Sequence, residues 1–225
     1  MNILIAATEV APFAKVTKLA EVTAELRSGL SALGHDVRVA IPCYRFLEDD
    51  ARLNPRPVID AVEFDWGGGS VGTVSVKVCL RDDALVYLVG GDDRFAAVRG
   101  PEEASTCDWA AYTFFTRALL EVIKVIEPRW IPDVIHVNDQ RNALLPAYLR
   151  VKYAVDPILS KVATVLSIHE PRSENSSGRA DLLKTGIAYV DVFEDASEGK
   201  SRPVHYFEDL YLHAYQRRNS RAMAA

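Results

Sequence analysis

No uninterrupted apolar stretch in this sequence approaches the roughly 18 residues that a membrane-spanning helix needs. The apolar opening, from Asn2 to Ala7, is short, and Glu9 follows it before any small-residue cleavage pattern. We therefore interpret it as a strand and not as a signal peptide. Cysteine is equally sparse, because no Cys-x-x-Cys pair occurs and the three cysteines are widely spaced, at Cys43, Cys79 and Cys107. Such spacing is typical of reduced structural thiols, so we expect a cytoplasmic protein with no membrane partner and no bound metal.

An excess of positive charge is also missing. The 26 Lys and Arg residues are outnumbered by 31 Asp and Glu residues, which gives a net charge of −5. Nucleic acids and anionic lipids select basic surfaces, so we expect neither as a partner. The apolar and charged fractions, 49% and 25%, are ordinary for a globular protein, and the length fits a single domain over residues 1–225.

Strand and helix patterns alternate along the first forty residues. Residues 3–7 form a continuous apolar run, which is typical of a parallel strand covered on both faces. Between Leu19 and Leu33 apolar residues recur at steps of three and four, as in an amphipathic helix that Thr17 caps and Gly34 ends. Residues 35–41 then read as a second strand. Strand–helix–strand units of this kind build parallel sheets with right-handed crossovers.

The middle of the chain carries three strand-like segments, which predict a hairpin insertion. Within it, residues 67–72 have the letters of a dinucleotide-binding fingerprint, but a strand and not a helix follows them, so we interpret them as a turn. We expect no cofactor. With the segments that follow, the pattern predicts an α/β fold, a Rossmann-like, doubly wound, mostly parallel sheet with a β-hairpin insertion. The strands are expected at residues 58–66, 71–80, 85–89, 133–137 and 161–168, and the helices at 106–126, 142–153, 181–189 and 206–218.

Polar residues follow three predicted strands at their carboxyl ends, where open α/β sheets place ligands. Lys15 lies between the first strand and a helix start, a position that favours anions, although lysines at such positions are more often solvated. Asn138 and Asp139 end a later strand, and Asp139 also suits the cap of the next helix. His169 ends another strand, as a ligand contact or as an ordinary loop residue. The strand residue His136 is either a core histidine or a ligand contact.

Residues 1–15, MNILIAATEVAPFAK, closely resemble the start of glycogen and starch synthases, which are glycosyltransferases of the two-domain GT-B fold. The likeness continues through later segments and covers residues 1–196; its clearest parts are residues 32–39, 132–139, 143–149 and 183–191. In that family the N-terminal domain handles the α-glucan acceptor and a C-terminal domain supplies most of the ADP-glucose site. The resemblance implies that this chain is the N-terminal half of a GT-B fold and that its C-terminal nucleotide-sugar domain is absent.

The resemblance also assigns roles to the residues at the strand ends. It implies that Lys15 contacts phosphate or sugar, that Asn138 and Asp139 belong to the substrate-binding cleft, and that His169, the one catalytic candidate, hydrogen-bonds the transferring glucose. The family reaction is a hexosyl transfer from ADP-glucose to an α-1,4-glucan with retention at the anomeric carbon.

Several positions depart from the family pattern. The family reads Lys-Thr-Gly-Gly-Leu where this chain has Lys15-Val16-Thr17-Lys18-Leu19. Glycine permits a positive φ and a close approach of the backbone to a ligand, and threonine and lysine resist both. Gln140, Glu170 and Ala111 replace a tryptophan, an asparagine and an arginine. These changes predict weakened binding of the nucleotide sugar on a retained scaffold.

Together these features predict a glycogen/starch synthase-like N-terminal domain that is inactive alone. Its expected ligands are α-glucan or ADP-glucose, bound weakly, and its expected role is binding or regulation. Two alternatives stay open. The chain is a subunit or fragment of an active synthase whose other half comes from a second protein chain, or it is a protein-interaction scaffold.

Overall fold

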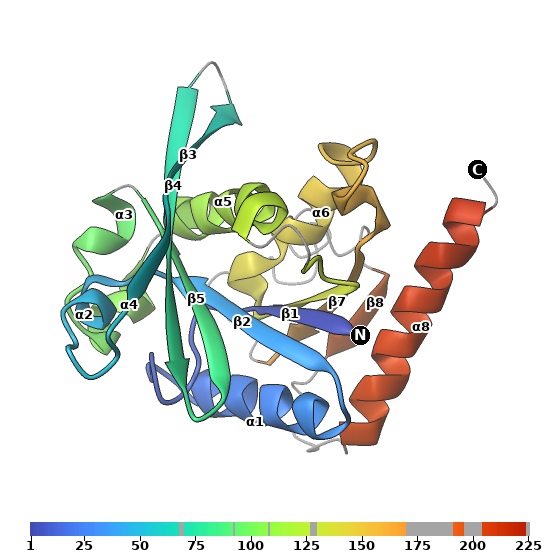
Figure 1. Cartoon of the computed structure of the whole chain (residues 1–225), viewed down its shortest axis with the longest axis horizontal. Coiled ribbons are helices and arrows are strands. Elements are labelled where there is room, and N and C mark those ends of the chain that lie inside the picture. Colours follow the sequence, from blue (N-terminus) through green and yellow to red (C-terminus); the bar gives the residue numbers. More distant parts are fainter. Residues whose placement is uncertain are drawn as a thin grey trace, which may run out of the picture.

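The computed structural model describes residues 1–67, 70–91, 93–107, 109–126, 130–169, 191–195 and 204–223. At its centre lies an eight-stranded sheet in the order β3-β4-β5-β2-β1-β6-β7-β8 (Figure 1). The strands from β5 to β8 along this order are parallel, whereas β3 and β4 are antiparallel. The strands are β1 (Asn2–Ala6), β2 (Asp36–Pro42), β3 (Arg56–Gly67), β4 (Ser70–Arg81), β5 (Ala84–Gly90), β6 (Val134–Asn138), β7 (Ala163–Ile168) and β8 (Val192–Asp195). The predicted α/β class, with a mostly parallel sheet and a hairpin insertion, is confirmed.

Helices cover both faces of the sheet. Figure 1 shows α1 (Leu19–Ala32) below the sheet and α5 (Trp109–Ile126) with α6 (Leu144–Val151) above it, while α8 (Val204–Met223) packs on β6, β7 and α1. Coverage on both sides explains the continuous apolar runs of the central strands, since every residue of β6 and β7 is buried. Short helices also connect these elements in the described ranges, namely α2 (Arg45–Glu48), α3 (Asp93–Ala96), α4 (Pro101–Thr106), η1 (Gln140–Asn142) and η2 (Leu159–Lys161).

The predicted hairpin insertion is smaller than the sequence suggested. β5 pairs antiparallel with β4 but parallel with β2, so it belongs to the parallel sheet and only β3 and β4 are inserted. Figure 1 shows the β3–β4 hairpin projecting beyond the rest of the sheet. Gly67 pairs with Ser70, which agrees with a turn at these residues because a strand follows them. Periodicity identified β5 as a strand, but its neighbours depend on the path of the chain in space.

Most predicted helices are found, with changes at their ends. The helix expected over 106–126 is found as α5, which starts at Trp109. Thr106 instead ends α4, a helix that the pattern did not predict, and Cys107, whose ψ of 138° is incompatible with a helix, separates the two. The helix expected over 142–153 becomes η1 followed by α6. The terminal helix is confirmed as α8, and its Tyr211 is fully buried against the domain. The helix expected over 181–189 and the substitution Glu170 lie outside the described residues.

Gly34 ends α1 in the manner that its position predicts. Its φ is 87°, its amide donates to the Ser31 carbonyl at 2.9 Å, and the His35 amide donates to the Leu30 carbonyl at 3.3 Å. This pair of bonds is a Schellman motif, which satisfies the last carbonyls of the helix.

Replacing Gly34 by alanine should therefore lower the free energy of unfolding by about 1 kcal/mol, the cost of a left-handed backbone in a residue with a Cβ. A Cβ at this position would meet nothing within 4 Å, so no steric clash adds to this cost. Urea unfolding measures the change. Gly100→Ala is the matched control, because a Cβ there also meets nothing and its φ of −162° suits alanine. Equal losses in the two variants would contradict the assignment of the cost to φ.

Candidate functional site

The residues singled out from the sequence follow the carboxyl ends of β1, β6 and β7, which share one edge of the sheet. The structure joins two of them directly, since Nε2 of His169 lies 2.6 Å from Oδ1 of Asn138. Asn138 is fully buried and donates through Nδ2 to Oγ1 of Thr23 on α1 at 2.8 Å. The polar ends of two strands and the side of a helix thus form one hydrogen-bonded group at this edge.

His136 lies two residues before Asn138 on β6 and is completely buried. Its Nε2 is 2.7 Å from Oγ of Ser167, and its Nδ1 contacts the Tyr211 hydroxyl. Burial, followed by the nearby His169, lowers the pKa of His136 to about 3. The imidazole is therefore neutral at physiological pH, and the structure supports the interpretation of His136 as a core histidine with satisfied hydrogen bonds.

Asp139 adopts an unusual backbone conformation directly after β6. Its φ is 79°, which few residues other than glycine adopt, and its carboxylate accepts a hydrogen bond from the Gln140 amide at 2.7 Å. The carboxylate caps the short helix η1, which agrees with the prediction that Asp139 caps the helix after its strand. Backbone strain of this kind concentrates at binding and catalytic sites, and a contact between Asp139 and substrate stays a prediction.

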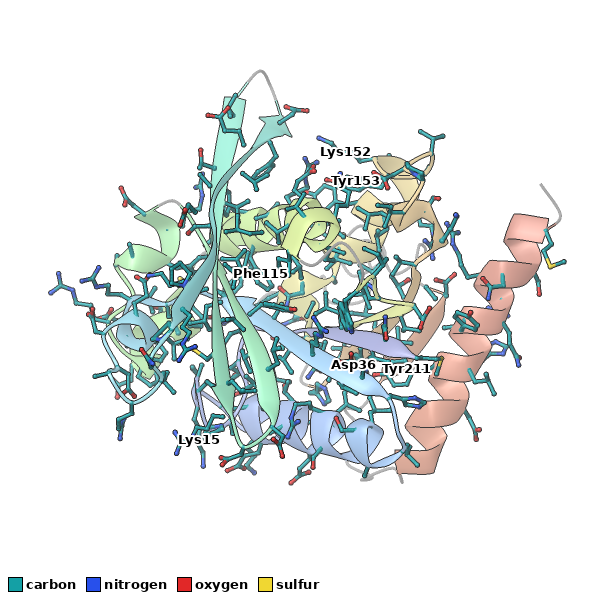
Figure 2. All side chains as sticks on the ribbon, in the orientation of Figure 1. Lys15, Asp36, Phe115, Lys152, Tyr153 and Tyr211 are labelled. Atoms are coloured by element: carbon teal, nitrogen blue, oxygen red, sulfur yellow. The ribbon has the colours of Figure 1, made fainter. Side chains whose placement is uncertain are left out.

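Lys15 lies on the outside of the β1–α1 loop (Figure 2). Its Nζ is 2.6 Å from Oε1 of Glu21 in an ion pair whose side chains are 64% and 52% exposed. Ion pairs in such exposed positions contribute little to stability, because water and salt screen them. The described contacts of Lys15 are thus those of a surface lysine, the second of its two predicted interpretations.

The same loop contains a buried carboxylate that the sequence analysis overlooked. Glu9 is only 4% exposed, and it accepts hydrogen bonds from the Val16 amide, the Thr17 amide and the Thr17 hydroxyl, each at 2.7 Å. The Thr17 hydroxyl in turn accepts from the Leu19 amide at 3.1 Å, so its side chain bonds to the first residue of α1. Lys18, which lies directly before α1, makes no capping hydrogen bond with its side chain. An acidic residue between a buried strand and a helix start was the signal available in the sequence, because helix N-termini attract negative charge.

A second overlooked group surrounds Arg141 at the same edge. Arg141 donates from Nη1 to the Tyr112 hydroxyl at 3.0 Å, and its guanidinium lies 5.0 Å from the centre of that ring. The Tyr112 hydroxyl donates to the Ala104 carbonyl at 2.9 Å, and the Tyr44 hydroxyl donates to the Thr8 carbonyl at 2.9 Å. Burial raises the pKa of both tyrosines, so their hydroxyls stay protonated. The contacts with Tyr112 fix the guanidinium of Arg141, two residues after Asp139 in the sequence.

Neither metal ligation nor thiol chemistry is indicated within the described part of the chain. No group of three His, Cys, Asp or Glu side chains in these ranges is placed to hold a metal ion. Burial, followed by the neighbouring Glu48, raises the pKa of Cys43 to about 12, and burial also raises the pKa of Cys79. Both thiols are therefore poor nucleophiles. Nor does any helix in the same ranges have the length and apolarity to cross a bilayer.

Comparisons with known proteins agree with the fold and with the order of these segments. Residues 2–208 match the family described as the starch synthase catalytic domain. Glycogen synthase 2 of Geobacter sulfurreducens is 36% identical over 194 residues, which are 83% of this chain and 38% of the relative. The glycogen synthase of Syntrophotalea carbinolica is 32% identical over 225 residues, 88% of this chain and 46% of the relative.

A solved structure is similar in the same region. The catalytic domain of starch synthase IV from Arabidopsis thaliana, bound to ADP and acarbose, superimposes with a TM-score of 0.64 and 25% identity. The match covers 75% of this chain and 34% of that one. This chain therefore spans less than half the length of the relatives that it matches.

Proposed function

Because the chain belongs to the starch synthase catalytic domain family, we propose that this domain binds an α-glucan at the carboxyl edge of its sheet and is inactive alone as a glucosyltransferase. Under this proposal, residues 15–19 do not hold the diphosphate of ADP-glucose. The role is that of a glucan-binding or regulatory domain derived from a synthase scaffold.

The hydrogen bonds of Glu9 carry the proposal. A helix N-terminus binds phosphate through backbone amides that point at the anion. Here the Val16 and Thr17 amides already donate to the buried Glu9 carboxylate. A phosphate that approached these amides would meet a negative charge at hydrogen-bonding distance and would have to displace it.

Transfer from ADP-glucose develops negative charge on the departing diphosphate, and cations or helix amides have to stabilise that charge. Lys15 is held by Glu21 in this structure. The loop before α1 therefore offers little stabilisation to a leaving diphosphate, which supports an inactive domain.

Binding of a glucan makes different demands, because its hydroxyl groups are neutral. They are recognised by paired donors and acceptors in a partly buried site. Asp139 and His169 supply such groups after adjacent strands, and the buried Asn138 holds His169 in place. The catalytic domain from Arabidopsis to which this chain is similar was solved bound to ADP and acarbose, so both kinds of ligand enter the test.

Calorimetric titration of the purified chain tests the proposal with maltoheptaose, ADP and ADP-glucose. We expect maltoheptaose to bind and the two nucleotides to give no heat of binding. His169→Ala should weaken maltoheptaose binding by about tenfold, or about 1.4 kcal/mol, since it removes a hydrogen bond from the site. Lys15→Ala is the control and should leave maltoheptaose binding unchanged. Binding of ADP-glucose that disappears in Lys15→Ala would overturn the proposal.

A second candidate function is that of a subunit or fragment of an active ADP-glucose-dependent synthase. The hydrogen bond between Asn138 and His169 favours this candidate, because both residues that the family resemblance assigns to the substrate cleft are present and in contact. Incorporation of glucose from ADP-glucose into glycogen by the chain, alone or with a co-purifying partner, would support this candidate. If maltoheptaose and both nucleotides fail to bind, a protein-interaction scaffold is the remaining function.

A further inference from the structure

We propose that Thr23 is a positioning residue that sets the tautomer of His169 through Asn138. In the neutral ring the proton is held on Nε2, and Nδ1 is the acceptor nitrogen. A contact between His169 and a glucan rests on the proposed function, whereas the proton on Nε2 follows from the hydrogen bonds that link Thr23, Asn138 and His169.

The chain of hydrogen bonds begins at a group that can only accept. Thr23 Oγ1 lies 2.8 Å from the carbonyl oxygen of Leu19, one helical turn earlier on α1. A carbonyl has no proton to give, so the Thr23 hydroxyl must donate its only proton to it. Thr23 is fully buried, so the hydroxyl does not exchange this bond for one to bulk water.

The orientation of the Asn138 amide follows from that first bond. With its proton engaged, Thr23 Oγ1 can only accept from the Asn138 atom that lies 2.8 Å away. That atom must then be the donor Nδ2, since Oδ1 carries no proton. Asn138 is also fully buried, and its Oδ1 is turned towards His169.

The proton on His169 follows in turn. Asn138 Oδ1 is an acceptor and lies 2.6 Å from Nε2 of His169, so Nε2 must carry the hydrogen. In a neutral imidazole the other nitrogen is then an acceptor. Thr23 and Asn138 carry no charge, so they act on His169 through the direction of hydrogen bonds and not through charge.

Nitrogen-15 NMR of the histidine rings tests this inference at about pH 8, above the ordinary histidine pKa of about 6.5. The His169 signals are identified by their loss in His169→Gln. We expect the wild-type ring to show the Nε2–H tautomer alone. A wild-type ring protonated on Nδ1 would overturn the proposal without any variant of Thr23.

Two substitutions at Thr23 then separate positioning from packing. Thr23→Val keeps the shape of the side chain but removes the hydroxyl, so we expect a mixture of both His169 tautomers. Thr23→Ser keeps the hydroxyl and should restore the single tautomer even if it loses some packing. A single Nε2–H tautomer in folded Thr23→Val would show that Thr23 does not set it. If Thr23→Val does not fold, loss of the single tautomer in Thr23→Ser would count against the proposal.

Binding of maltoheptaose to the same variants distinguishes this inference from the proposed function. Weakening by about threefold to tenfold in Thr23→Val with recovery in Thr23→Ser would support both. A tautomer that shifts as expected in a protein that binds no maltoheptaose would leave the relay intact and remove the glucan-binding function.

Discussion

Between pH 7 and pH 5 the protein should lose about 2 kcal/mol of folding stability through the side chain of His136. This imidazole is fully buried on β6, and its folded-state pKa is lowered to about 3. In the unfolded chain the ring titrates near its ordinary pKa of about 6.5. Between these two pKa values the unfolded state takes up a proton that the folded state excludes, so protonation favours unfolding.

The sign of the effect defines its pH range. The stabilising effect of a neutral His136 is fully present above pH 6.5 and decreases as the pH falls. The loss grows by about 1.4 kcal/mol per pH unit and stops once the pH passes below the folded-state pKa. Burial is the main cause, and the adjacent His169 adds to it.

Urea unfolding at pH 7, 6 and 5 measures this dependence in the wild type and in His136→Gln. Glutamine can bond to Ser167 and Tyr211 but does not titrate. The free energy of unfolding of the variant should therefore be lower at pH 7 and should change less with pH. His213→Gln is the control, because that histidine is exposed on α8 and its loss should leave the steep dependence in place. An equally steep loss in His136→Gln would assign the acid sensitivity to other groups.

Replacement of Glu9 by alanine should lower the free energy of unfolding by about 3 kcal/mol. The carboxylate accepts three hydrogen bonds, from the Val16 and Thr17 amides and the Thr17 hydroxyl. Bonds to a charged acceptor contribute more than bonds between neutral groups, and all three are lost together in this variant. Glu9 also lies close to the start of α1, where negative charge is favourable.

The matched control for this variant is Glu21→Ala, a carboxylate in the first turn of α1 that pairs with Lys15 of the same loop. Its ion pair with Lys15 is exposed and screened by water, so its removal should leave the stability nearly unchanged. Glu9→Gln keeps the shape and one acceptor oxygen and should fall between the two alanine variants. If Glu9→Ala and Glu21→Ala lose equal stability in urea unfolding, Glu9 does not hold the loop together and the main support for the proposed function is removed.

Several elements were predictable because their signals are local. Residues 3–7, 19–33 and 35–41 were expected as strand, helix and strand, and the structure has β1, α1 and β2 within one or two residues of these bounds. Apolar periodicity and a glycine at the end of the helix depend only on neighbours in sequence. The division of α4 from α5 has no such signal, because Cys107 has no intrinsic tendency to end a helix.

The candidate site was predictable only as a location. Parallel strands end on one edge of a sheet, so Asn138, Asp139 and His169 were expected there from their positions alone. Which of them bond to one another was not predictable. The relay joins Thr23 to Asn138 across 115 positions and Asn138 to His169 across 31.

The sequence by itself determined the α/β class, the likeness to starch and glycogen synthases and the identity of the polar residues at the strand ends. These properties are encoded in short patterns that are read without knowing the path of the chain. Only the tertiary structure decided that β5 joins the parallel sheet, that Glu9 occupies the amides of Val16 and Thr17, and that His136 is neutral. Burial and the direction of hydrogen bonds depend on which distant segments are packed together. Burial shifts the pKa of a side chain, and its hydrogen bonds decide which of its atoms can donate or accept towards a ligand.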